Sequence, residues 1–179
     1  MKPYTYLTLI LVVIVATGCR SSYRNDDRDR IPPPELLAFH MVDSFGVDSE
    51  IEPLTQLTLN PFRDSGLFEV FWDVDNEDDY FVEMSINDRP SLNGRVSIIE
   101  ELCGPGLECD LFGEFFCEYN AEYSISCDLP SEEFPGQFPV LFDDLIIDLG
   151  EPQRMYFILE ICDTNSNICE FQILDVIME

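Results

Sequence analysis

From residue 35 to the C-terminus, apolar residues recur at every second position in short runs that turn residues separate. Such alternation is typical of β-strands with one buried face, because successive side chains point to opposite sides of a strand. The pattern is clearest in residues 67–74 and 79–87, and the first of these runs places Trp72 on its buried face. No segment carries a sustained helical stripe with capping signals. The pattern therefore predicts an all-β domain over residues 35–179.

The turn residues between the runs indicate how the strands are connected. Residues 75–78 are polar and separate the two clearest runs, so we expect these two strands to form a hairpin. Strands at this density favour two antiparallel sheets packed as a sandwich. Further strands are expected at residues 36–42, 54–59, 96–101, 114–119, 123–127, 145–149, 155–162 and 169–177.

Residues 145–162, LIIDLGEPQRMYFILEIC, contain an apolar run, then Leu-Gly-x-Pro, and then a tyrosine that enters an alternating strand. This short stretch is similar to the corner between the penultimate strands of fibronectin type III and immunoglobulin-like domains. The resemblance implies that Tyr156 is a corner tyrosine whose hydroxyl bonds back to the chain. Together with the strand pattern, it predicts an immunoglobulin-like antiparallel β-sandwich.

Six of the seven cysteines lie in the predicted domain, and no two of them form a C-x-x-C pair. An even set without that spacing favours disulfides of an oxidising compartment over a zinc site. A turn centred on Asn165 and Ser166 would bring the last two cysteines opposite each other, and a hairpin tip at residues 120–122 would do the same for the middle two. Other connectivities stay open. The sequence favours the local pairs Cys103–Cys109, Cys117–Cys127 and Cys162–Cys169.

Residues 1–19, MKPYTYLTLILVVIVATGC, begin with a positive charge at Lys2, continue with an apolar core and end in small residues before Cys19. This is the layout of a secretory signal peptide. The apolar run is shorter than the roughly 20 residues that a membrane-spanning helix needs. Its end, Ala-Thr-Gly-Cys, resembles a bacterial lipoprotein signal, which implies cleavage after residue 18 and lipidation of Cys19. An ordinary signal peptide or a membrane anchor stays open.

Residues 19–34 are expected to connect this lipid to the domain. They are polar and charged, and they end in three prolines. Such a segment contains too little apolar surface to fold and forms an extended tether. The residue after Cys19 is Arg20. Aspartate there is the usual inner-membrane retention signal of lipoproteins, so the resemblance implies a lipid anchor in the outer membrane, with the domain facing the periplasm or the medium.

The chain has 36 acidic and 9 basic residues and a formal net charge of −27. A domain this acidic repels the phosphates of nucleic acids and anionic lipid surfaces, which excludes both as partners of the domain itself. Three explanations of the charge stay open, namely solubility, a basic protein partner and divalent cations.

An acidic stretch at residues 73–79 is the best candidate for a cation site, because Ca²⁺ binds closely spaced carboxylate oxygens. It departs from the EF-hand pattern, since Asp78 stands in place of the glycine and Met84 in place of the bidentate glutamate. A solvated hairpin tip is the alternative. The candidate Ca²⁺ ligands are Asp73, Asp75, Glu77 and Asp79.

His40 is the only histidine and lies in an apolar run, so we expect a strand histidine with satisfied hydrogen bonds rather than a catalytic base. The sequence shows no nucleophile elbow and no phosphate-binding glycine loop, and no catalytic residue is assigned. The leading expectation is a non-catalytic binding or structural module of the cell envelope with a protein partner. The alternatives are a calcium-dependent binding module and a hydrolase of envelope polymers.

Overall fold

The computed structural model of the protein describes residues 34–76, 78–128, 139–147 and 150–179, which all belong to the unit Ile31–Glu179. The predicted signal peptide, Cys19 and the tether up to residue 33 lie outside the described residues, as does Glu77.

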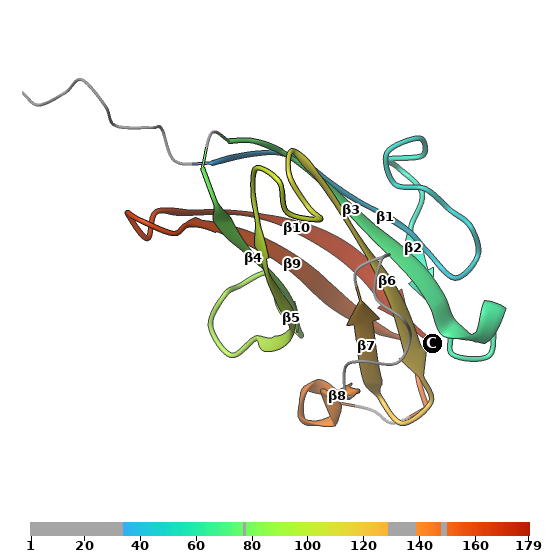
Figure 1. The fold of residues 1–179 in the computed structure, drawn as a ribbon. Coiled ribbons are helices and arrows are strands. Elements are labelled where there is room, and N and C mark those ends of the chain that lie inside the picture. The colour runs from blue at the N-terminus through green and yellow to red at the C-terminus, as the bar shows by residue number, and fades with distance from the viewer. Residues whose placement is uncertain (1–33, 77, 129–138, 148–149) are drawn as a thin grey trace, which may run out of the picture. The chain divides into compact units, whose positions relative to one another are not determined.

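Two five-stranded sheets make up the described part of the chain (Figure 1). Sheet A has the strand order β1-β3-β6-β7-β8 and sheet B the order β2-β10-β9-β4-β5. All paired strands are antiparallel except β2 and β10, which are parallel. The strands are β1 (Glu35–Val42), β2 (Leu57–Leu59), β3 (Leu67–Asp75), β4 (Tyr80–Asn87), β5 (Val96–Cys103), β6 (Phe112–Asn120), β7 (Ser124–Asp128), β8 (Val140–Leu141), β9 (Gln153–Asp163) and β10 (Cys169–Met178).

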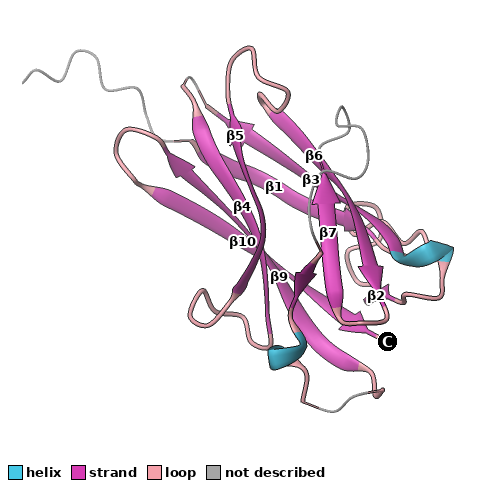
Figure 2. Ribbon diagram, turned by 60° about the horizontal axis from the view of Figure 1, so that its bottom comes forward, coloured by secondary structure: helices cyan, strands magenta, loops and turns pink. Residues whose placement is uncertain are grey.

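The only helices among the described residues are two short 3₁₀ turns, η1 (Asp64–Gly66) and η2 (Asp143–Leu145), which lie at strand ends (Figure 2). The prediction of an all-β sandwich with local disulfides is therefore confirmed.

The strand order corresponds to that of immunoglobulin-like domains, in which strands A, B, E and D form one sheet and C, F and G the other. β1, β3 and β6 occupy the places of A, B and E, and β4, β9 and β10 those of C, F and G. One difference concerns β7, which lies beside β6 in the place of strand D but follows β6 in the chain instead of preceding it. The chain from β6 to β9 thus extends sheet A by two strands before it crosses to sheet B.

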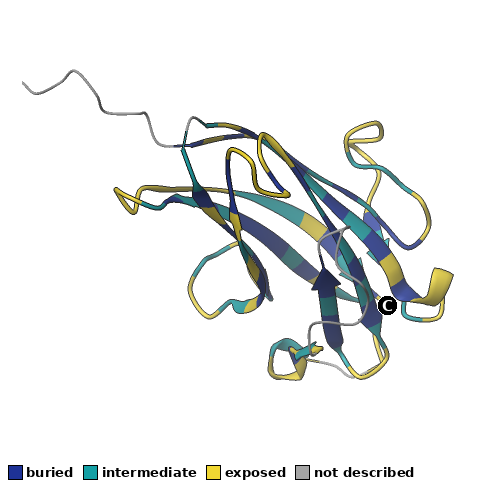
Figure 3. Ribbon diagram, viewed as in Figure 1, coloured by how far each residue is buried: buried dark blue, intermediate teal, exposed yellow. Residues whose placement is uncertain are grey.

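The core lies between the two sheets and contains the alternate residues that the period-two pattern predicts (Figure 3). On β3 the buried set includes Trp72, whose ring centroid is 4.6 Å from that of Phe115 on β6. Phe68 of sheet A meets Phe157 of sheet B edge to face, with centroids 5.6 Å apart. These aromatic contacts join the two layers, and burial of each large side chain contributes about 2–3 kcal/mol.

The predicted hairpin between residues 67–74 and 79–87 is wrong, because β3 and β4 belong to different sheets. The short connection crosses the sandwich, so that the buried faces of both strands meet in the core. There the Trp72 indole Nε1 donates a hydrogen bond to the Tyr80 hydroxyl at 3.3 Å, and that hydroxyl donates to the Asp110 carbonyl at 2.8 Å. Burial raises the pKa of Tyr80 to about 12. Alternation identifies the buried face of a strand but not the sheet to which the strand belongs.

Three disulfides join the pairs that the sequence favours. Cys117–Cys127 connects the paired strands β6 and β7 in the core, and Cys162–Cys169 connects β9 and β10 near the surface. Cys103–Cys109 closes the loop after β5 and is buried. Each disulfide bridges neighbouring segments and so stiffens sheet ends and connections.

Two predicted strands differ from the structure. Residues 54–56 precede β2 as an exposed turn, in which the Thr55 amide donates to the Glu52 carbonyl. Residues 145–147 form no strand, because the Gln153 side chain binds their backbone, accepting from the Ile147 amide and donating to the Leu145 carbonyl, each at 2.9 Å. Residues 148 and 149 lie outside the described part, and the short strand β8 was not predicted.

Tyr156 lies in β9, and the partner predicted for its hydroxyl is not among the described residues. Its hydroxyl makes no hydrogen bond within the described residues, and the side chain lies half-buried on the outer face of β9. Another tyrosine holds this corner, since the Gly150 amide donates to the Tyr123 hydroxyl at 3.0 Å. The interaction comes from the segment before β7, which the local sequence of the corner could not reveal.

Candidate functional site: an acidic and aromatic sheet face

The outer surface of sheet A carries an unusual set of side chains on β1, β3 and β6. They alternate with buried core residues, so they point away from the other sheet. The strand register places His40 opposite Phe71, and Phe71 opposite Glu114. We call this surface the acidic aromatic face and define it by His40, Glu69, Phe71, Phe112, Glu114 and Phe116.

Three rings of this face form a row across the sheet. His40 stacks on Phe71 with centroids 5.0 Å apart and an interplanar angle of 15°. The next ring in the row is that of Phe112, whose centroid lies 6.0 Å from that of Phe71 with an interplanar angle of 26°. Phe112 is 50% exposed, so the row ends in a phenyl ring that solvent reaches. Aromatic side chains accessible on an outer sheet face are a common feature of binding surfaces.

The carboxylates of Glu69 and Glu114 lie beside this row, and Asp73 is the register partner of Phe112 at its end. Burial raises the pKa of Glu114, and the negative charge of Glu69 on the neighbouring strand raises it further. None of the four arginines in the described part of the chain forms an ion pair with either glutamate. The face therefore combines aromatic rings with carboxylates that no basic side chain of the described chain neutralises.

A hollow of about 360 Å³ adjoins the face where β1 ends. Its lining is mixed, with apolar side chains beside carboxylates. Phe116 and Glu69 belong both to this hollow and to the acidic aromatic face. A ligand segment that lies along the face could therefore insert one side chain between the strands and the loop after β1. The lining residues of sheet A and the adjoining loop include Val42, Asp43, Gly46, Leu67, Glu69 and Phe116.

The loop after β1 brings two further carboxylates to His40. It folds back on the strand through a bridge between Val42 and Asp48 and a hydrogen bond from the Ser49 amide to the Met41 carbonyl at 3.0 Å. Glu50 Oε2 consequently lies 3.6 Å from His40 Nε2. One ligand atom from each of His40, Asp48 and Glu50 lies within 4.8 Å of the others.

The expectation that His40 has satisfied hydrogen bonds is wrong. Its Nδ1 is buried without a hydrogen-bond partner, and the 3.6 Å separation between Nε2 and Glu50 exceeds hydrogen-bond distance. The side chain is 15% exposed and faces outward beside the loop. Sequence reasoning placed His40 in the correct strand, but the loop that covers the ring depends on contacts outside the strand.

The predicted calcium ligands are not brought together by the residues that the structure describes. Asp73, Asp75 and Asp79 form no group of three within ligand distance of one another, and Glu77 lies outside the described residues. Asp73 lies within β3 and Asp75 ends it, while Asp79 follows the crossing to sheet B. In addition, the Asp78 side chain accepts a hydrogen bond from Asn165 at 2.9 Å. Along the described part of this loop, the carboxylates are separated by strand geometry and by local hydrogen bonds.

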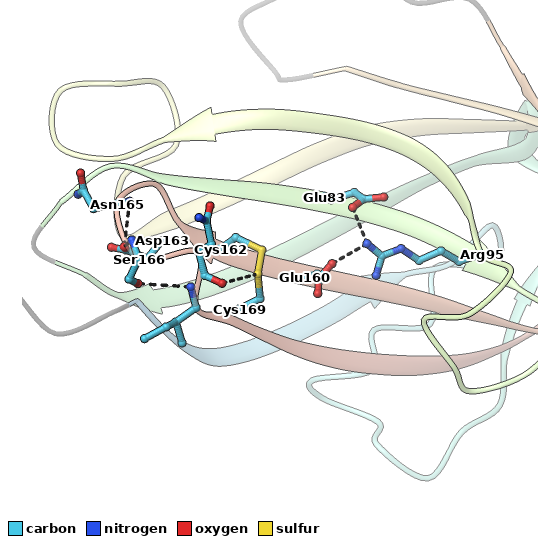
Figure 4. Close-up of a disulfide and its surroundings, with 10 residues drawn as sticks. Glu83, Arg95, Glu160, Cys162, Asp163, Asn165, Ser166 and Cys169 are labelled. Carbon is cyan, nitrogen blue, oxygen red and sulfur yellow. Dashed lines mark hydrogen bonds and ion pairs between the residues drawn. A yellow bond between two sulfur atoms is a disulfide. The ribbon is translucent and has the colours of Figure 1, made fainter.

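A different charged cluster lies on sheet B (Figure 4). Glu83 of β4 and Glu160 of β9 are opposite each other in the register, and Arg95 Nη2 lies 2.6 Å from a carboxylate oxygen of each. The guanidinium offsets the repulsion between two like charges on neighbouring strands. Glu160 also lies near Cys162 and Cys169, but these cysteines are joined in a disulfide and are not available as thiolate ligands. This cluster is structural.

The hairpin tip beyond that disulfide is held by Asp163, whose carboxylate accepts hydrogen bonds from the amides of Asn165 and Ser166 (Figure 4). The bonds from Ser166 lower the pKa of Asp163, because they stabilise the ionised carboxylate. This arrangement is an Asx turn that sets the register of β9 and β10. The Asp163 carboxylate therefore has a structural role, because its hydrogen bonds hold the turn.

No protein-family model, no curated protein and no solved structure matches this chain.

None of the helices in the described residues is long and apolar enough to cross a membrane.

Proposed function

We propose that the protein is a non-catalytic binding module of the bacterial cell envelope, anchored there by lipid on Cys19. Its acidic aromatic face binds a basic segment of an envelope protein. The signal-like N-terminus and the polar tether support the anchor. The observation that carries the binding proposal is the row of His40, Phe71 and Phe112 beside the unneutralised carboxylates of Glu69 and Glu114.

The chemistry of this face fits arginine and lysine side chains. A guanidinium or ammonium group is attracted to the face of an aromatic ring, with a contribution of about 0.5–1 kcal/mol at an exposed site. A neighbouring carboxylate adds a charge-assisted hydrogen bond to the same cation. Phe71 and Glu114 are opposite each other in the strand register, so one basic side chain can contact both. Several such contacts along one segment would combine into specific binding.

The net charge of the chain supports the same class of partner. The formal net charge of −27 attracts basic segments of other proteins at long range and repels acidic segments. Long-range attraction alone would not distinguish one part of the surface from another. The aromatic row supplies that distinction, since cation–π contacts require a ring within about 6 Å of the cation.

Site-specific photocrosslinking in intact cells tests this proposal. Benzoylphenylalanine would replace Phe112 on the acidic aromatic face or, as a matched control, Phe81 on the outer face of sheet B. The two rings are 50% and 42% exposed, so the substitutions are equivalent in kind. We expect position 112 to crosslink to one envelope protein, at a peptide rich in arginine or lysine, and position 81 not to do so. The same products at both positions, or a peptide without basic residues at position 112, would contradict the proposal.

A further inference from the structure

We infer that His40, Asp48 and Glu50 form a binding site for one divalent transition-metal ion of the Zn²⁺ class. These residues differ from the acidic stretch that the sequence indicated, and the inference does not depend on the proposed partner of the acidic aromatic face. It rests on an unsatisfied imidazole, on the distances between three ligand atoms, and on the way the fold holds them.

The first observation is the state of the His40 side chain. It is mostly buried, yet neither ring nitrogen makes a hydrogen bond with any described residue, and Nδ1 is buried without a partner. The two nitrogens of an imidazole point in different directions, so one ion can bind only one of them, and a buried Nδ1 is usually paired with an ordered water. The nitrogen that faces the carboxylates is Nε2, which is a common metal ligand.

The second observation is the geometry of the ligand atoms. The three atoms offered by His40, Asp48 and Glu50 all lie within 4.8 Å of one another, and the pair Nε2 and Oε2 lies 3.6 Å apart. Two atoms that each bind a tetrahedral Zn²⁺ at about 2.1 Å are about 3.4 Å apart. The separation of the imidazole and the Glu50 carboxylate is therefore close to that of two ligands of one ion.

The fold holds this arrangement from two sides. Stacking on Phe71 fixes the plane of the imidazole, and the strand β1 fixes its position. The bridge between Val42 and Asp48 returns the loop to the strand, and the Asp48 carboxylate accepts a hydrogen bond from the Glu50 amide at 2.9 Å. Glu50 is 69% exposed, which leaves an open path for an ion and room for water ligands.

The ligand set selects the class of ion. Imidazole binds Zn²⁺ and its transition-metal neighbours, whereas Ca²⁺ takes six to eight oxygen ligands. One nitrogen and two carboxylates leave a fourth position of a tetrahedral ion for water or for a group of a partner molecule. The two carboxylates also balance the charge of a divalent ion.

Nuclear magnetic resonance of ¹⁵N-histidine tests this inference directly on the full chain in detergent, because His40 is the only histidine. The metal-free protein would be titrated with Zn²⁺, and Ca²⁺ would serve as the comparison ion. Asp48→Asn/Glu50→Gln removes the two carboxylate charges without changing side-chain size, and both positions are solvent-accessible. Asp73→Asn/Asp75→Asn is the control, since it removes the same charge from the acidic stretch.

We expect Zn²⁺ to shift the Nε2 signal with an endpoint of one ion per chain, and Ca²⁺ not to do so. Affinity should fall at least about tenfold in Asp48→Asn/Glu50→Gln and remain within about twofold in Asp73→Asn/Asp75→Asn. An Nε2 signal that Zn²⁺ does not move, or an equal affinity in both variants, would overturn the inference. Because only the single imidazole is observed, zinc bound elsewhere on this acidic chain produces no Nε2 shift, and a buffered free Zn²⁺ concentration keeps the affinities comparable.

Discussion

Replacing Gly113 with alanine should destabilise the domain by about 3 kcal/mol, the upper end of the range for overpacked cores. The added Cβ would lie 1.8 Å from Cζ2 and 2.0 Å from Cε2 of Trp72. Trp72 is fully buried, and its indole nitrogen is bound to the Tyr80 hydroxyl, so the ring has no free space to enter. For a domain of this size, the loss corresponds to a fall in melting temperature of roughly 6–12 °C. Thermal melting followed by circular dichroism would measure it.

Two variants separate this steric effect from a general effect of substituting glycine. Gly46→Ala adds a methyl group where no atom lies within 4 Å, so it should cost only the strain of a positive φ of 78°, about 1 kcal/mol. Trp72→Phe makes room above Gly113, so the double variant should be less destabilised than the sum of the single changes. Strict additivity, or a stable Gly113→Ala single variant, would show that the close packing of Gly113 on Trp72 is not required.

Replacing Cys19 with serine should abolish lipidation of the chain. Serine cannot carry the thioether-linked lipid that the signal-like sequence implies, and each buried methylene of such a lipid contributes about 0.8 kcal/mol to anchoring. We expect metabolic labelling with radioactive palmitate to disappear, and the chain to fractionate as a soluble or an unprocessed form. Equal palmitate incorporation in the wild-type and Cys19→Ser chains would contradict the proposed anchor. Ser22→Ala, outside the signal, is the matched control.

Local regularities of the sequence predict most of the fold. Alternation identifies Trp72 as buried, because the side chains of a strand strictly change sides. Turn symmetry identifies Cys162 and Cys169 as partners, because a short hairpin forces opposite positions together. The pairing of β3 with β1 and β6 could not be predicted from alternation or from turn symmetry. A connection of about four residues suits a hairpin and also a crossing between sheets, and the choice depends on how both buried faces pack.

The candidate sites were less predictable than the fold. Glu69 and Phe71 stand on the outward side of a predicted strand, but the neighbours that make them a binding face come from β6 and β1. His40 is conspicuous in the sequence as the only histidine, whereas its proximity to Glu50 depends on a loop that folds back on β1. The acidic stretch at residues 73–79 was the most visible candidate, yet its described carboxylates are not gathered in space. The strand register shows which side chains share one face of a sheet, and sequence proximity does not.

The most direct test of the account is the affinity of the full chain, in detergent at near-physiological ionic strength, for an arginine-rich peptide. Isothermal titration calorimetry would compare Glu69→Gln/Glu114→Gln with Asp143→Asn/Asp144→Asn, which removes the same charge from η2. We predict affinity at least about fivefold weaker for the first variant and nearly unchanged for the second, because cation–π and carboxylate contacts act together on the acidic aromatic face. Equal losses in both variants would show that the peptide responds only to net charge, and would contradict binding at this face.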